Sequence, residues 1–226
     1  MITRPHLVQR VDFLRRLCAG RSVLHLGCTN WPYMDVSSAD DRFLHPVLMQ
    51  SAREVWGIDA DKAGLDAMRE QGVPNLLEGD LEALERLPLD KTFDVIVAGE
   101  VIEHLSNPGL FLAGVQRFMR KDTDLVVTTV NAFCGFRAAV YAIRGKGGIS
   151  EPVHPDHVAY YSYSTLGHIG RRAGLRMREF AFYDLGNEHR PVTRRSISLI
   201  NDVLVTFAPQ LADGVIGIFQ LDGERA

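Results

Sequence analysis

An acidic and histidine-containing cluster follows a short apolar run near the middle of the chain. The run at residues 93–98, FDVIVA, is rich in β-branched residues and predicts a strand that is buried on both faces. Glu100, Glu103 and His104 come next, at positions i, i+3 and i+4. One helical turn would place these three side chains on one face. We therefore expect a group of polar side chains at the carboxyl end of a central strand, where open α/β sheets bind ligands.

Three kinds of chemistry are open to this cluster. In the first, His104 or His157 is a general base that takes a proton from a substrate hydroxyl or amine, with Glu103 in the same catalytic set. In the second, the cluster holds a divalent ion, and Mn²⁺ or Co²⁺ accepts imidazole better than a hard cation does. In the third, Glu100 holds a cofactor or a backbone amide and His104 caps a turn. Our prediction names His104, His157 and Glu103 as catalytic residues and names no metal ligand.

Three apolar segments upstream each end at a glycine or a carboxylate. VLHLGCTN at 23–30 turns at Gly27, where the missing Cβ lets the backbone approach a ligand. VWGIDAD at 55–61 ends at Asp59, whose carboxylate can accept both hydroxyl groups of a ribose. LLEGDLEAL at 76–84 supplies Asp80, which can accept from the amine of adenine, and Leu81, which can cover the ring. Taken singly, each segment is also explained as an ordinary turn or helix cap.

Strands and helices alternate along most of the chain, which predicts parallel pairing with right-handed crossovers. We expect one domain over 1–226, with an N-terminal helix within 1–20, a loop at 30–43 that can fold over the site, a substrate-side insertion or lid at 131–163 and a helical insertion at 187–213 before the last strand. The expected strands are 22–26, 54–58, 75–78, 93–98, 125–130, 175–183 and 215–221, and the expected helices are 44–53, 61–71, 108–119, 164–173 and 194–207.

Together these features resemble the class I, Rossmann-like S-adenosylmethionine-dependent methyltransferases, of the small-molecule, UbiG-like type. The resemblance rests on Gly27, Asp59, Asp80 and the segment FDVIVAGEVIEHL, and it covers roughly residues 20–130. The segment VIGIFQL extends it to the end of the chain as the last strand. The resemblance implies a doubly wound α/β fold with a seven-stranded, mostly parallel sheet in the order 3-2-1-4-5-7-6, the last strand antiparallel, and helices on both faces. The chain departs from the usual GxGxG loop, since it has only Gly27 there.

The resemblance also implies S-adenosyl-L-methionine as the cofactor and in-line methyl transfer to an acceptor. The segment HVAYYSYSTL at 157–166 is similar to loops that line the acceptor pocket of small-molecule methyltransferases, so Tyr160, Tyr161 and Tyr163 are candidate contacts. Aromatic and basic residues at 133–146 suggest a small-molecule, glycan or lipid-linked acceptor for O- or N-methylation. The residues carried over as cofactor-binding are Gly27, Cys28, Asp59, Ala60, Asp80, Leu81, Ala98, Gly99 and Glu100.

Two alternative functions stay open. Glu100, Glu103, His104 and His157 match the metal-binding set of the small-RNA 3′-end 2′-O-methyltransferases, so the first alternative is RNA methylation at a metal site. The net charge of −3, the pI of about 6.2 and the lack of a recognisable RNA-binding module argue against a nucleic-acid partner. The second alternative is a non-catalytic nucleoside-binding protein of the same fold, which is favoured by the presence of only one glycine, Gly27, in place of the usual GxGxG loop.

Composition and charge fit a globular cytoplasmic protein. A chain of 226 residues with 46% hydrophobic residues suits one domain with a full core. Arginines interrupt the apolar residues near the start, and no apolar run reaches the roughly 20 residues of a membrane span, so we expect neither a signal peptide nor a membrane helix. The three scattered cysteines predict thiols rather than a disulfide or zinc site. The apolar stripe at 194–207 offers a surface for docking on the sheet or for a homodimer.

Overall fold

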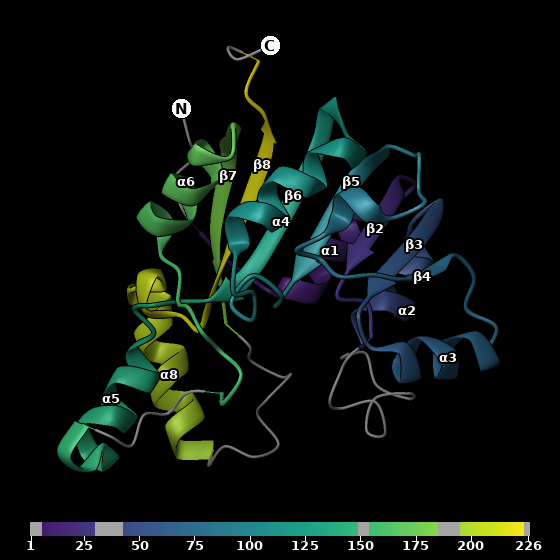
Figure 1. Cartoon of the computed structure of the whole chain (residues 1–226). Coiled ribbons are helices and arrows are strands. Elements are labelled where there is room, and N and C mark those ends of the chain that lie inside the picture. Colours follow the sequence, from purple (N-terminus) through teal and green to yellow (C-terminus); the bar gives the residue numbers. More distant parts are fainter. Residues whose placement is uncertain (1–5, 30–42, 149–153, 185–194, 224–226) are drawn as a thin grey trace.

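An eight-stranded sheet forms the centre of the molecule, with helices on both of its faces (Figure 1). The computed structural model describes residues 6–29, 43–148, 154–184 and 195–223. Most of the loop expected to fold over the site, and parts of the two expected insertions, lie outside these residues. Within the described part of the chain, no helix combines the length and apolar character needed to cross a bilayer.

The elements follow one another as the alternating pattern predicted. The strands are β1 (Leu7–Val8), β2 (Ser22–Leu26), β3 (Glu54–Asp59), β4 (Leu76–Glu78), β5 (Phe93–Gly99), β6 (Met119–Val130), β7 (Leu175–Tyr183) and β8 (Gly214–Leu221). The helices are α1 (Arg10–Cys18), α2 (Leu44–Ser51), α3 (Lys62–Glu70), α4 (Pro108–Val115), α5 (Gly135–Arg144), α6 (Tyr163–Arg172) and α8 (Arg195–Phe207).

The strand order is β1-β7-β8-β6-β5-β2-β3-β4. Counted from β2, seven strands follow the expected order, and β8 runs antiparallel to both of its neighbours. The seven-stranded prediction is wrong in one respect, because β1 adds an eighth strand that pairs in parallel with β7. Leu7, which falls within the expected N-terminal helix, lies in this edge strand. The helix begins only at Arg10, where the Gln9 side chain accepts a hydrogen bond from Asp12 N (2.8 Å).

Apolar side chains fill both sides of the sheet. On one face, α4 and α6 pack over a large core whose buried members include Phe111 of α4 and Leu166 of α6. On the other, Leu14 of α1 and Leu48 of α2 belong to a second core with residues of the central strands. Because the central strands are buried on both faces, they read as continuous apolar runs in the sequence. The two layers leave the ends of the strands as the positions where polar loops can gather.

The helix after β5 is shorter than its apolar spacing predicted. It ends at Val115, and Met119 already begins β6, a strand that starts several residues before the expected position 125. Thr123 explains the early start, since its buried hydroxyl accepts from Arg120 N (2.8 Å) and donates to Phe93 O (2.6 Å). These bonds hold a polar stretch beside β5 that an apolar pattern does not reveal.

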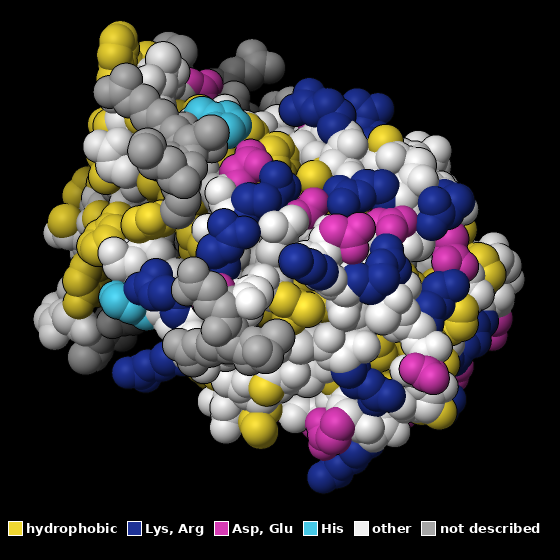
Figure 2. Space-filling model, turned by 90° about the horizontal axis from the view of Figure 1, so that it is seen from above, with side chains coloured by type: hydrophobic (Ala, Val, Ile, Leu, Met, Phe, Trp, Pro, Cys, Tyr) yellow, Lys and Arg dark blue, Asp and Glu magenta, His cyan; other side chains and the backbone are white. Residues whose placement is uncertain are grey.

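An ion-pair network joins the strands at their amino ends. The Asp94 carboxylate accepts from Ser22 N (2.8 Å) and Ser22 Oγ (2.9 Å), and it also pairs with Arg53 and Arg120. These donors, the Ser22 backbone N–H above all, lower the pKa of Asp94 to about 2. Figure 2 views this end of the molecule and shows basic and acidic side chains interspersed rather than a uniformly basic surface. This end therefore carries structural ion pairs, and the loops at the opposite end carry the candidate site.

Helices α5 and α8 lie beyond the carboxyl end of β6 (Figure 1). Asn131 joins the segment before α5 to the segment after α8, because its side chain donates to Gln210 O (2.9 Å) and Ala212 O (2.7 Å). Arg137 of α5 donates to the carbonyl groups of Asn131 (2.9 Å) and Asp213 (2.7 Å). This guanidinium therefore binds the backbone of its own chain, whereas the side chain of Arg144, at the end of α5, is exposed.

Candidate cofactor and acceptor site

The carboxyl ends of four neighbouring parallel strands lie level with one another. In the register of the sheet, Leu26 of β2 pairs with Ile58 of β3 and with Ala98 of β5, and Asp59 of β3 pairs with Glu78 of β4. The residues that directly follow Leu26, Asp59, Glu78 and Ala98 therefore lie along one edge of the sheet. Those residues are Gly27, Ala60, Gly79 and Gly99.

Gly27 makes the sharp turn at the end of β2. Its φ of 72° lies in the left-handed region that disfavours side chains, and its N–H donates to Ile58 O (2.9 Å). A Cβ at this position would also overlap Cγ2 of Val101, which packs against it. One glycine is therefore enough to form this turn, although the usual loop of the family has more.

Cys28 and Thr29 follow Gly27 and are buried. The Cys28 thiol packs in a small core with Leu65 and Met68, so only the backbone of this residue is placed to meet a cofactor. All three cysteines of the chain are buried free thiols, as expected. The Thr29 hydroxyl is buried without a hydrogen-bond partner among the described residues. Such an unpaired group marks a place where a further polar partner is needed.

Asp59 stands at the tip of β3 with a partly exposed side chain. Its Oδ2 accepts from Thr29 N (2.8 Å), and its Oδ1 accepts from Asp61 N (2.9 Å). Each carboxylate oxygen can accept a second hydrogen bond. The two bonds orient the carboxylate and leave acceptor capacity for a pair of hydroxyl groups, which is the chemistry that a ribose requires. Ala60, next to it, is exposed.

Asp80 begins the loop beside Asp59. Gly79 N donates to Asp59 O (2.9 Å), and this bond joins the ends of β4 and β3. The exposed Asp80 accepts from Glu82 N through Oδ1 (2.8 Å), which confirms the turn and leaves Oδ2 available. Leu81 is 8% exposed and belongs to the main core. The two acids thus lie on adjacent loops at one edge, where a single nucleoside can reach both.

Glu100 is anchored at the end of β5 in an unusual backbone conformation. It follows the buried Ala98 and the partly exposed Gly99, and its φ is 55°. Its N–H donates to Thr128 O (3.0 Å), and its Oε1 accepts from Thr128 Oγ1 (2.9 Å) and from the Tyr183 hydroxyl. Arg10 Nη1 lies 4.0 Å from the same oxygen. These partners compensate for the strain of a non-glycine residue in the left-handed region.

The expectation that Glu100, Glu103 and His104 share one face of a helix is wrong. The chain makes a tight turn here, which places Glu103 inside the protein and leaves His104 exposed. Glu103 Oε2 accepts from Thr129 Oγ1 (2.8 Å), whereas Oε1 has no hydrogen-bond partner among the described residues. Burial first, and then the charge of Glu100, raise the pKa of Glu103 well above its usual value. The left-handed backbone at Glu100 explains why the three side chains do not share a helix face, since it prevents a helix from starting there.

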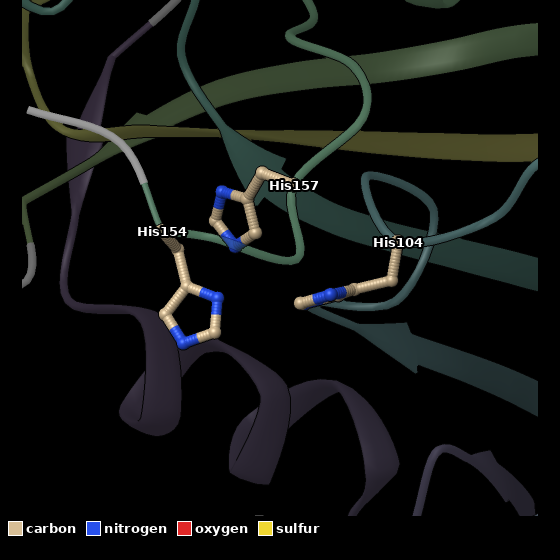
Figure 3. A group of neighbouring side chains, drawn as sticks. All are labelled: His104, His154 and His157. Carbon is tan, nitrogen blue, oxygen red and sulfur yellow. The ribbon is translucent and has the colours of Figure 1, made fainter. Parts of the chain in front are cut away.

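Three imidazole rings gather beside this turn: those of His104, His154 and His157 (Figure 3). One nitrogen from each ring lies within 4.8 Å of the others, and the ring centroids of His104 and His157 are 4.7 Å apart. Burial, followed by the neighbouring histidines, lowers the pKa of His157 to about 4 and also lowers the pKa of His104. Two members were predicted as catalytic residues. The sequence also contains His154 in the same HPDH stretch, but its spacing did not show that it lies beside His104.

Backbone hydrogen bonds hold the two histidine loops together. The Glu103 carbonyl accepts from Val158 N (2.9 Å) and Ala159 N (3.3 Å), directly after His157. Further along, Ala132 N donates to Tyr161 O (2.8 Å), so the loop continues beside the end of β6. The proximity of residues about 50 positions apart is therefore a property of the backbone and does not depend on the rotamers of the rings alone.

The three candidate tyrosines differ in their surroundings. Tyr161 is buried in the main core, and Tyr163 is exposed at the start of α6, with its ring against Phe180. The Tyr160 ring lies 6.1 Å from that of His157, centroid to centroid. Of the three, Tyr160 is therefore the one beside the histidine cluster.

The fold and the strand-edge site define an α/β protein of the Rossmann-like, nucleoside-binding class. A family model described as a methyltransferase domain matches residues 9–179. The chain belongs to this family and is an S-adenosylmethionine-dependent methyltransferase. The partly exposed Asp59 carboxylate, which keeps acceptor capacity beside its two backbone hydrogen bonds, fits an adenosyl group at this edge.

Relatives and solved structures agree with this assignment. A ubiquinone biosynthesis O-methyltransferase of Pseudomonas aeruginosa strain LESB58 is 24% identical over 201 residues, which are 85% of this chain and 78% of that protein. A probable S-adenosylmethionine-dependent methyltransferase of Mycolicibacterium smegmatis is 28% identical over 167 residues, 74% of this chain and 56% of that protein. A SAM-dependent methyltransferase from Archaeoglobus fulgidus has the same fold, with a TM-score of 0.62 at 20% identity over 93% of this chain and 92% of the other.

Proposed function

We propose that this enzyme methylates a hydroxyl oxygen of a small acceptor, which enters from the histidine side of the strand edge. The observation that carries the proposal is the arrangement of the loops: the strand edge with Asp59 and Gly99 continues into the turn that presents His104. The relatives named as ubiquinone biosynthesis O-methyltransferases favour oxygen over nitrogen as the methylated atom. Acceptors linked to a glycan or a lipid belong to the same proposal.

The residues at the ends of β2 to β5 bind and orient the cofactor in this proposal. Asp59 accepts the ribose hydroxyl groups, Asp80 accepts from adenine, and Gly27 allows the methionine part to approach the backbone. When bound, S-adenosylmethionine supplies an electrophilic methyl group, and methyl transfer needs an aligned acceptor more than a strong acid–base pair. The remaining predicted contacts, Cys28, Ala60, Leu81, Ala98 and Glu100, are proposed through their backbone or through packing.

The acceptor hydroxyl must lose its proton, and the histidine cluster is the group that faces it in this proposal. His104 and His157 act on that proton, either as neutral imidazole bases or through a bound ion. Glu103 takes a different role from the one that its spacing suggested. Since its side chain is fully buried on Thr129, we propose that it positions the turn and does not contact the acceptor.

Helices α5 and α8 are proposed to flank the acceptor. They stand beyond the carboxyl end of the sheet, and Gly135 of α5 lies against Leu204 of α8. Exposed apolar side chains on and beside this pair, such as Phe133 and Ile143, suit an acceptor with an apolar body. Phe207 of α8 is 85% exposed, and it keeps the alternative of a homodimer open. A cytoplasmic location also stays a proposal, which the free thiols support.

The experiment is a screen for formation of S-adenosylhomocysteine with phenols, sugar derivatives, lipid-linked intermediates and short RNAs as acceptors. His157→Ala is tested beside His168→Ala, whose exposed ring lies on α6 outside the cluster. We expect turnover with a hydroxyl-bearing small molecule, a large loss in His157→Ala and none in His168→Ala. Turnover with RNA only would contradict the proposed acceptor class. Cofactor binding without turnover on any acceptor would favour the non-catalytic alternative.

A further inference from the structure

The acids and histidines that the metal-site alternative groups together are not assembled as one set. Glu103 is fully buried and bonded to Thr129, and Glu100 is bonded to Thr128 and Tyr183. The Glu-Glu-His-His set that suggested an RNA methyltransferase is therefore divided between the protein interior and the loops. The side chains that do converge are imidazoles, which are suited to a different kind of ion from the one that carboxylates favour.

We propose that His104, His154 and His157 form a binding site for one divalent ion of borderline softness, such as Zn²⁺ or Co²⁺. The three ligand nitrogens lie within 4.8 Å of one another, and ligands around a zinc ion at about 2.0–2.1 Å are roughly 3.3 Å apart. Binding an ion would therefore draw the three rings closer together. Three protein ligands leave at least one coordination position open, as in catalytic rather than structural zinc sites.

The surroundings of the rings support a built site. His157 N donates to His154 O (3.1 Å), so these two residues are held in one tight turn, and the Glu103 carbonyl joins that turn to His104. His154 Nδ1 faces Asp156, whose N–H lies 3.3 Å and whose Oδ2 lies 3.7 Å away. In Figure 3 this same nitrogen lies on the side of the other two rings, so an ion would bind there in place of the weak contact with Asp156 N.

A histidine binds a metal through a neutral nitrogen, so a protonated ring must first release its proton. Three uncharged ligands would leave the full positive charge of the ion at the mouth of the acceptor site.

A metal ion here would explain how the enzyme handles the acceptor proton, and this second step rests on the proposed function. An ion with an open position can bind a hydroxyl oxygen and lower its pKa, so that the oxygen reacts as its anion near neutral pH. In that case the imidazoles are ligands rather than bases. The inference of a metal site itself does not depend on the identity of the acceptor.

The test measures metal binding without cofactor or acceptor. Protein freed of metal with a chelator is titrated with Co²⁺, and the visible absorption of the bound ion is followed; Zn²⁺ is then added in competition. We expect one equivalent to bind, and affinity to fall by about tenfold or more, some 1.4 kcal/mol, in His154→Ala and in His157→Ala. The matched control, His168→Ala, removes an exposed histidine that pairs with Arg171, and it should bind as the unmodified protein does.

Two results would overturn the metal site. One is the absence of stoichiometric Co²⁺ binding to the unmodified protein, and the other is an equal loss of binding in His168→Ala. Calorimetry with S-adenosylhomocysteine on each variant shows whether it is folded, because Asp59 and Gly27 lie outside the histidine cluster. Metal binding with no methylation of a hydroxyl acceptor would refute the proposed function and leave the metal site standing.

Discussion

Replacing Asp59 with alanine removes the residue that carries most of the cofactor assignment. The wild-type carboxylate accepts two backbone N–H groups, at 2.8 and 2.9 Å, and has capacity for two ribose hydroxyl groups. Hydrogen bonds to a charged group contribute about 1.5–3 kcal/mol each. Loss of two ribose bonds therefore costs at least about 3 kcal/mol, which is roughly a 100-fold increase in the dissociation constant for S-adenosylhomocysteine.

The same change also leaves the N–H groups of Thr29 and Asp61 without their acceptor. We therefore expect the free energy of unfolding to fall by about 1–3 kcal/mol, which is measurable by chemical denaturation. Asp59→Asn keeps one acceptor oxygen and should lie between the wild type and Asp59→Ala in affinity. Asp66→Ala is the matched control, because Asp66 pairs with Lys62 and Arg69 on the outside of α3.

Isothermal titration calorimetry with S-adenosylhomocysteine measures these affinities, and circular dichroism confirms that each variant is folded. The expected order is wild type equal to Asp66→Ala, then Asp59→Asn, then Asp59→Ala. A folded Asp59→Ala protein that binds within about threefold of the wild type would refute the reasoning, since that difference is under 1 kcal/mol.

Three further substitutions test the fold, two of them at the site and one at the opposite end of the sheet. Gly27→Ala should lose cofactor affinity and about 2–4 kcal/mol of stability, because the left-handed φ and the overlap with Val101 both oppose a methyl group; unchanged denaturation and calorimetry would contradict this. Asp94→Asn should lower the free energy of unfolding by about 1 kcal/mol at pH 7. Because the pKa of Asp94 is depressed from 3.8 to about 2 in the folded protein, this difference from wild type should shrink as pH falls through that range. A difference in stability that does not change with pH would refute the prediction. The raised pKa of Glu103 in the folded protein predicts that wild-type stability declines as pH rises above about 4.5, and Glu103→Gln should remove this decline. Parallel plots of stability against pH for the two proteins would show that Glu103 is not held neutral beside Thr129.

Local patterns in the sequence were sufficient to predict seven of the eight strands, and the order of those seven was implied by the family resemblance. The apolar run of β5 predicted a central strand, because a strand covered on both faces has no polar positions. Gly27 and Asp59 could be assigned to strand tips for a related reason, since a glycine or carboxylate directly after such a run interrupts it. Their register, level across β2, β3 and β5, then follows from parallel pairing.

Features that depend on distant partners could not be predicted. The two residues of β1 form a strand only because β7 offers an edge, so Leu7 looked like part of the following helix. The turn after β5 depends on Thr128 and Tyr183 holding Glu100 at a φ of 55°, and neither partner is near it in the sequence. His154 joins His104 through a loop 50 positions later, which no local spacing reveals.

The central claim is that one strand edge binds the adenosyl group and turns the reactive sulfur toward the histidine cluster. A crystal structure with S-adenosylhomocysteine tests it most directly. We expect both ribose hydroxyl groups within hydrogen-bonding distance of the Asp59 carboxylate, adenine beside Asp80 and Leu81, and the sulfur on the side of His104 and His157. A ligand bound elsewhere, or one whose sulfur points away from the three imidazoles, would contradict it.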